Sequence, residues 1–101
     1  MTGDPNANDL KVEDNPAARR YEARVGSEVA GVIYYDGEPD RIRLIHTEVD
    51  QAFEGKGIAS RLVSGALADI RRRGLTVVPI CRFVRSYLER HPEDADVVAG
   101  D

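Results

Sequence analysis

The sequence predicts a mixed α/β fold with a single sheet, in which an antiparallel three-strand meander is followed by a helix, a parallel strand and a C-terminal helix. Three observations support this order. Short segments of alternating polar and apolar residues, separated by turn-forming residues, fill the first half of the chain. A stretch of helical period follows them. A continuous apolar run then leads into a second amphipathic stretch.

The meander is expected to comprise residues 20–25, 29–35 and 41–49, joined by tight turns rich in Gly, Asp and Pro. Simple alternation in the third segment divides its side chains between two faces. One face would carry Ile42, Leu44, His46 and Glu48, and the other Ile45, Thr47 and Val49. Because both faces carry apolar residues, we expect this strand to be central and covered on both sides.

The first helix is expected from residue 57 to 73. Apolar residues recur there at four-residue spacing, namely Ile58, Leu62, Ala66 and Ile70. Residues 76–81 form a continuous apolar strand, which a right-handed crossover would place parallel to residues 41–49. The second helix is expected over residues 83–90 and is stopped by a His-Pro pair.

Pro79 interrupts the apolar strand and has no N–H group for the sheet. We therefore expect pairing to stop near Pro79, so that the sheet opens at the end facing the first helix's N-terminus. The alternative is that Pro79 simply ends the strand one residue early.

Length and composition indicate one domain, which we place at residues 19–92 of the 101. Residues 1–18 are rich in Asp, Asn, Gly and Pro and are expected to form a disordered tail, and residues 93–101 an acidic tail. No apolar run has the length of a membrane span, and the start of the chain does not look like a signal peptide. We expect a cytoplasmic monomer that does not bind membranes.

Charge and cysteine content argue against a disulfide, a metal site and nucleic-acid binding. One cysteine excludes an internal disulfide, and two distant histidines add no metal-ligand set, so no metal site is expected. The net charge is −4, yet residues 41–91 are basic. That balance is typical either of a solvated helix face or of a positive field around an anionic ligand. Few aromatic residues accompany these charges, which argues against nucleic-acid binding.

The most informative segment joins the third strand to the first helix and contains Gly55 and Gly57. Glycines let the backbone approach a ligand closely, and the following helix points free N–H groups at the same place. This arrangement predicts a phosphate or pyrophosphate site. The alternative is an ordinary loop before a helix.

Three segments together resemble the GCN5-related N-acetyltransferases, in particular a group of small single-domain members. They are His46-Thr47-Glu48-Val49, Glu54-Gly55-Lys56-Gly57-Ile58-Ala59-Ser60-Arg61-Leu62 and Val78-Pro79-Ile80-Cys81-Arg82-Phe83-Val84. The loop is similar to the family's acyl-CoA pyrophosphate loop, although Glu54 replaces the usual Gln or Arg. The resemblance covers roughly residues 20–92 and implies acetyl-CoA or CoA as a substrate. It implies that the CoA-binding residues are Val49, Gly55, Lys56, Gly57, Ile58, Ala59, Ser60, Cys81 and Phe83.

The resemblance also implies catalytic roles. Glu48 and His46 are the candidates for removing a proton from the incoming amine. The alternatives are that His46 is a hydrogen-bonded core residue and that Glu48 is an exposed residue without a catalytic role. The backbone N–H of Val49 would stabilise the oxyanion. Tyr87 would protonate the leaving thiolate, or serve only in packing. Cys81 would contact the CoA end, form an acetyl-cysteine, or act as a small apolar residue.

The resemblance implies an acetyl-CoA-dependent N-acetyltransferase that transfers the acetyl group directly to an amine. Typical members carry extra helices between their first strands, whereas this chain joins its strands by tight turns. An open acceptor side would suit a protein or peptide. A CoA or acyl-CoA binding module without catalysis is the alternative, and a domain whose loop binds nothing is a third possibility.

Overall fold

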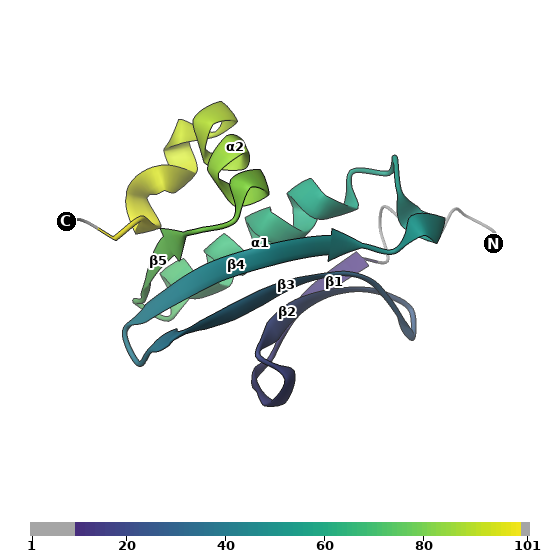
Figure 1. The fold of residues 1–101 in the computed structure, drawn as a ribbon, viewed down its shortest axis with the longest axis horizontal. Coiled ribbons are helices and arrows are strands. Elements are labelled where there is room, and N and C mark those ends of the chain that lie inside the picture. The colour runs from purple at the N-terminus through teal and green to yellow at the C-terminus, as the bar shows by residue number, and fades with distance from the viewer. Residues whose placement is uncertain (1–9, 100–101) are drawn as a thin grey trace.

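The structure, a computed structural model, describes residues 10–99. Five strands form one sheet in the order β1-β2-β3-β4-β5 (Figure 1). The strands are β1 (Leu10–Asn15), β2 (Arg20–Val25), β3 (Glu28–Glu38), β4 (Arg41–Val49) and β5 (Thr76–Pro79). β1 to β4 pair antiparallel, and β5 pairs parallel with β4. The predicted mixed sheet is confirmed, with one more strand in the meander than expected.

The two α-helices and the last 3-10 helix pack together on one face of the sheet (Figure 1). The helices of the described residues are α1 (Ile58–Arg72), α2 (Arg82–Arg90) and the short 3-10 helices η1 (Pro16–Ala18), η2 (Gln51–Phe53) and η3 (Pro92–Val97). α1 contacts every strand, and α2 and η3 lie beside it. None of the helices in the described part of the chain has the length and apolarity that crossing a membrane requires.

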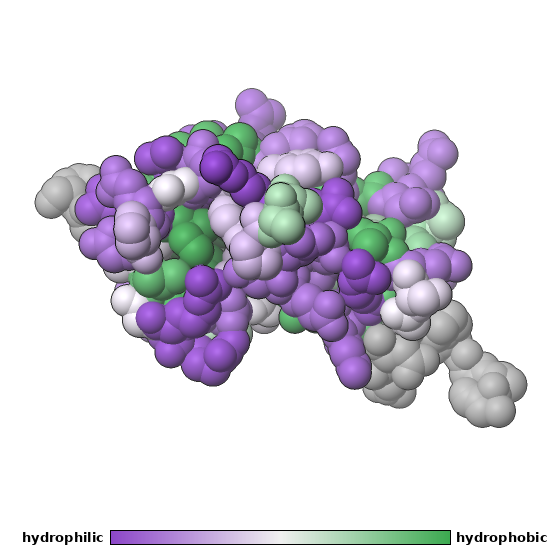
Figure 2. Space-filling view, turned by 90° about the horizontal axis from the view of Figure 1, so that it is seen from below, coloured by the Kyte–Doolittle hydropathy of each residue, from purple (hydrophilic) through white to green (hydrophobic). Residues whose placement is uncertain are grey.

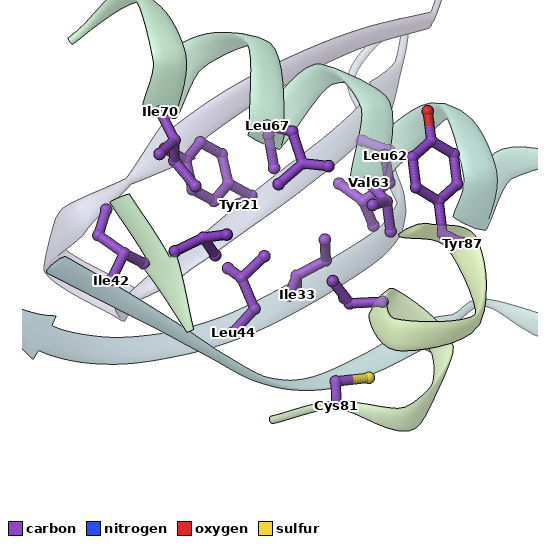
Figure 3. Packing of buried hydrophobic residues seen from close by; sticks show 14 of the residues in the cluster. Tyr21, Ile33, Ile42, Leu44, Leu62, Val63, Leu67, Ile70, Cys81 and Tyr87 are labelled. Carbon is purple, nitrogen blue, oxygen red and sulfur yellow. The ribbon is translucent and has the colours of Figure 1, made fainter. Parts of the chain in front are cut away.

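The core lies between α1 and the sheet (Figure 3). The predicted apolar stripe of α1 is buried, with Leu62, Leu67 and Ile70 fully enclosed against strand residues such as Ile33 and Leu44. Each such side chain contributes about 1.5–3 kcal/mol of burial free energy. This packing fixes the N-terminus of α1 beside the start of β3 and the end of β4.

The expectation of a disordered tail over residues 1–18 is wrong from residue 10 onward. β1 pairs with β2 over six residue pairs. Val12 packs so closely on α1 that a Cβ added to Gly65 would lie 2.6 Å from the Val12 Cβ. The hydroxyl of Tyr35 donates to Asp14 at 2.6 Å. Residues 1–9 lie outside the described part of the chain.

The expected acidic tail also packs onto the domain over residues 93–99. Val97 of η3 is buried, and the N–H of Ala99 donates to Val77 O on β5 at 2.8 Å. Arg71 of α1 binds Asp96 at 2.7 Å and Asp94 at 3.3 Å. These acidic residues are therefore ion-pair partners of α1, and the last two residues of the chain lie outside the described part.

A β-bulge changes which side chains of β4 share a face. Tyr34 pairs with His46 and Tyr35 pairs with Leu44, so Ile45 has no partner on β3. The extra residue reverses the alternation. His46 and Glu48 therefore lie on the face away from the helices, which we call the outer face. The faces expected from simple alternation are wrong, and so is the expectation that β4 is covered on both sides, because Ile45, His46 and Glu48 are exposed.

Candidate functional site

β4 and the edge strand β5 part midway along β4. They pair only from Arg41 opposite Thr76 to Leu44 opposite Pro79. The Leu44 carbonyl then accepts two N–H groups, from Ile80 at 3.1 Å and Cys81 at 2.9 Å. β4 continues to Val49 without a β5 partner. The structure thus has the interruption that Pro79 predicts, and we call the space beside residues 45–49 the opening.

The N-terminus of α1 faces this end of the sheet. Gly57 is its N-cap, with φ of 73°, and Gly55 has φ of 81°, a region that favours glycine. The first intrahelical bond runs from Arg61 N to Gly57 O at 3.2 Å, and no described side chain caps the helix. The N–H groups of the first turn are therefore available to an anionic ligand.

A cavity of about 250 Å³ connects this loop to the end of β4. Its lining contains seven of the nine predicted CoA-binding residues. The lining residues are Val49, Phe53, Glu54, Gly55, Gly57, Ile58, Ala59, Ser60 and Phe83. Lys56 is exposed and lies outside the lining, as does Cys81. Phe53 of η2 was missed, since an isolated aromatic residue in a polar loop gives no periodic signal.

Cys81 lies at the opening as the N-cap of α2 and is 8% exposed. Its Sγ is 3.3 Å from the Thr47 Oγ1, and either atom can be the donor. Burial raises the pKa of the Cys81 thiol, but several hydrogen bonds outweigh burial and leave the pKa below its ordinary value. They come from the Thr47 hydroxyl and from the backbone N–H groups of Val84, Phe83 and Thr47. The thiolate is therefore stabilised here.

The backbone of β4 also points donors into the opening. The Asp50 N–H donates to Ala30 O on β3 at 2.8 Å. Because neighbouring N–H groups of a strand point in opposite directions, the Val49 N–H points away from β3. It therefore faces the same side as the Thr47 N–H, which reaches Cys81. This N–H group could therefore stabilise an oxyanion next to the Cys81 thiol.

His46 and Glu48 lie together on the outer face of β4. Their Nε2 and Oε2 atoms are 3.1 Å apart, and both side chains are more than half exposed. The His46 ring is stacked with that of Tyr34, with centroids 6.5 Å apart. Figure 2, which views the molecule from below Figure 1, shows a largely hydrophilic surface with separate apolar patches. The two proton-transfer candidates are therefore solvent-accessible rather than core residues.

Tyr87 lies apart from the other candidates. Its hydroxyl donates to Asp94 at 3.0 Å, and its ring stacks on that of His91 at 4.3 Å. Burial raises its pKa above the ordinary value, and Asp94 adds to the effect while a hydrogen bond with Ser64 opposes it. In Figure 3 its hydroxyl points away from Cys81. The residue lines another cavity, of about 510 Å³, between β1, α1 and α2, and this cavity shares Ser60 with the one at the glycine loop.

Thr47 is the site residue to which the sequence assigned no role. Simple alternation placed it on the face opposite Leu44, whereas the bulge turns it towards Cys81. Its position in the His-Thr-Glu-Val segment was the available signal. The structure thus joins Thr47, Val49 and Cys81 at the opening, with His46 and Glu48 on the outer face and Tyr87 elsewhere.

Comparison with known proteins identifies the family. The sequence model of the GCN5-related N-acetyl-transferase family matches residues 20–97. The chain is similar to Protein NATD1 of Mus musculus, with 31% identity over 85 residues that cover 82% of this chain and 77% of the mouse protein. The human NATD1 protein is likewise 31% identical, and 75% of it is covered.

Solved structures show the same fold. A GCN5-like protein of Staphylococcus aureus, determined by NMR, superposes with a TM-score of 0.67 at 20% identity and covers 94% of this chain and 93% of its own. A Bacillus subtilis acetyltransferase in complex with CoA gives a TM-score of 0.50 at 20% identity, covering 69% of this chain and 61% of its own. The sequence match over residues 20–97 shows that this chain belongs to the GCN5-related N-acetyltransferases.

Proposed function

We propose that the protein is an acetyl-CoA-dependent N-acetyltransferase that acetylates an amine of a protein or peptide. The observation that carries this proposal is the parting of β4 and β5 after Leu44, next to the cavity at the glycine loop. The glycine loop with the helix N-terminus, an unpaired strand edge and a thiol then follow one another in space. Acetyl-CoA has its pyrophosphate, its pantetheine arm and its thioester in the same order, and it would therefore fit this arrangement.

The described residues fit CoA. The free N–H groups at the start of α1 would hold its pyrophosphate, and the first helical turn contains no acidic residue. The free edge of β4 would pair with the amides of the pantetheine arm as an added strand. Phe53 and Phe83 would cover its apolar part. Acetyl-CoA supplies the activated acetyl group.

Two groups of β4 would perform the transfer. Glu48, directly or through a water, would remove a proton from the ammonium form of the acceptor, with His46 at 3.1 Å as the second candidate. The amide of Val49 would donate to the carbonyl oxygen as negative charge develops there. These roles require the acceptor to reach the opening from the outer face.

Cys81 and Thr47 would stabilise the departing thiolate of CoA. Their 3.3 Å contact lies at the deep end of the opening, whereas the Tyr87 hydroxyl is bound to Asp94. Direct transfer is favoured over an acetyl-cysteine route, in which the Cys81 sulfur would take the acetyl group and CoA would leave as its thiol. Rapid quenching followed by intact-mass analysis separates the routes, since an added acetyl mass on Cys81 contradicts direct transfer.

The test of this function is an acetyl-CoA titration followed by amide NMR, with a panel of peptides in the same samples. Shifts at Gly55 to Ser60 and at Cys81, together with acetylated peptide, are expected. Binding without transfer to any amine would favour a CoA-binding module without catalytic activity. The exposure of both proton-transfer candidates is the observation that favours this second function. No shifts at millimolar ligand would contradict both.

A further inference from the structure

A third cavity lies on the outer face, at the end of β4. It has a volume of about 300 Å³ and is lined by residues of β2, β3 and β4 and by the loop after β4. These residues are Arg20, Val29, Ala30, Gly31, Val32, Tyr34, Glu48, Val49 and Asp50. Val49 also lines the cavity at the glycine loop. Val49, whose amide faces the opening, therefore borders both cavities.

One end of this outer cavity is positively charged. The Nε of Arg20 donates to Glu22 at 2.8 Å, while another of its guanidinium nitrogens lies 3.5 Å from the Tyr34 hydroxyl. Glu22 is 1% exposed and also binds Arg24 at 2.9 Å and Asn15 at 2.9 Å. Glu22 is thus shared by two guanidinium groups, and Arg24 has Glu13 as a further partner at 3.7 Å. The Arg20 guanidinium, held by Glu22, lines the cavity next to Tyr34.

The other end of the outer cavity is negatively charged. Glu48 and Asp50 both line it, and Glu48 is exposed beside His46. Asp50 accepts the Ala52 N–H at 2.9 Å, which fixes its carboxylate. The cavity therefore has a carboxylate end near the opening and a guanidinium end on β2. A row of directly opposed residues, Arg20, Tyr34 and His46, connects the two ends across the sheet.

We propose that this cavity selects an acceptor chain whose amine is followed by a carboxylate about two strand spacings away. The inference rests on the proposed function and names its substrate class. Adjacent strands lie about 4.8 Å apart, so β2 and β4 are separated by roughly 10 Å. Glu48 lies across from Glu22, two residues from Arg20, so the diagonal from Glu48 to Arg20 is roughly 12 Å. An extended peptide advances about 3.4 Å per residue. An N-terminal amine at Glu48 therefore places an acidic side chain of residue three at Arg20.

Polyamines and basic peptides fit the cavity poorly. Their second cation would lie against the Arg20 guanidinium, and like charges at close range repel. An acidic side chain would instead form a charge-assisted hydrogen bond with Arg20, and the hydroxyl of Tyr34 can donate a second one. The apolar floor, Val32, is 6% exposed and supplies no competing polar group.

The test compares three amidated peptides that are identical except for Glu, Gln or Arg at position three. Each has one amine, at its N-terminus. We expect kcat/KM in the order Glu, Gln, Arg, with Glu at least roughly tenfold above Gln. Arg20→Gln should abolish the preference. Arg24→Gln is the matched control, because Arg24 shares Glu22 but does not line the cavity, and it should keep the preference.

Binding provides a second readout that does not depend on turnover. Amide NMR at Tyr34 and Glu48, with CoA present, should rank the three peptides in the same order. Equal binding and equal rates for the Glu and Gln peptides would overturn the inference, and so would an unchanged preference in Arg20→Gln. If acetyl-CoA itself fails to bind, the proposed function fails, while the ranking of the peptides still decides the character of the outer cavity.

Discussion

Replacing Thr47 by Val should slow the reaction of Cys81 with iodoacetamide at neutral pH. Valine keeps the shape of threonine but removes the hydroxyl that lies 3.3 Å from the sulfur. A hydrogen bond to a charged group is worth about 1.5–3 kcal/mol, and each 1.4 kcal/mol is a factor of ten. The thiolate of Cys81 should therefore be populated roughly tenfold less below its pKa. The backbone donors of Val84 and Phe83 remain in the variant.

The assay is intact-mass measurement of the alkylation rate as a function of pH. The chain has one cysteine, so every added mass reports on Cys81. The profile of Thr47→Val should move to higher pH and reach the same plateau, while Thr47→Ser, which keeps a hydroxyl, should follow the wild type. Superimposable profiles for Val and wild type would refute the argument that this hydroxyl stabilises the thiolate.

Three further predictions concern packing and charge. A hydrogen bond from Asn15 and two arginines lower the pKa of Glu22, so its contribution to stability is complete above about pH 5 and is lost as pH falls. Glu22→Gln should cost about 2 kcal/mol at pH 7, because it weakens hydrogen bonds to a charged group, and should flatten the fall of Tm at acid pH. Gly65→Ala should destabilise the fold by about 1 kcal/mol or more in urea, because the clash with Val12 exceeds the gain in helix propensity, and Val12→Ala should relieve it. Stabilisation by Gly65→Ala alone would contradict that packing. Tyr87→Phe should leave kcat within about twofold and lower stability by about 1 kcal/mol, since its hydroxyl bonds an acidic residue away from Cys81. A hundredfold loss of kcat would instead support the acid role.

The fold was predictable where sequence periodicity was clear. The bounds of β2 and β4 and the buried stripe of α1 follow from alternation and four-residue spacing. β1 was missed because its two apolar residues, Leu10 and Val12, stand among Asp, Asn, Glu and Lys. Its stability comes from tertiary packing on α1 and from pairing with β2, neither of which leaves a local signal. The same holds for η3, which is fixed by ion pairs with Arg71.

Most residues that line the candidate site could be predicted from the sequence, but their arrangement could not. Glycine spacing located the loop, and Pro79 located the opening. The side chains of β4 could not be placed, because a single inserted residue at Ile45 carries no composition signal and yet reverses every later side chain. The position of Tyr87 depended on the rotation of α2, which η3 helps to fix through Asp94.

The bulge determines which side chains at the end of β4 face Cys81 and which face solvent. With uninterrupted alternation, His46 and Glu48 would share the helix-covered face with Leu44, where an ionised pair would be costly to bury. Thr47 would then point away from Cys81. Adding Ile45 to the strand places Thr47 at the thiol and leaves His46 and Glu48 in solvent. An acetyl donor bound at the glycine loop and an acceptor on the outer face would then approach from opposite sides of one strand. Val49, which lines both cavities, would be their meeting point.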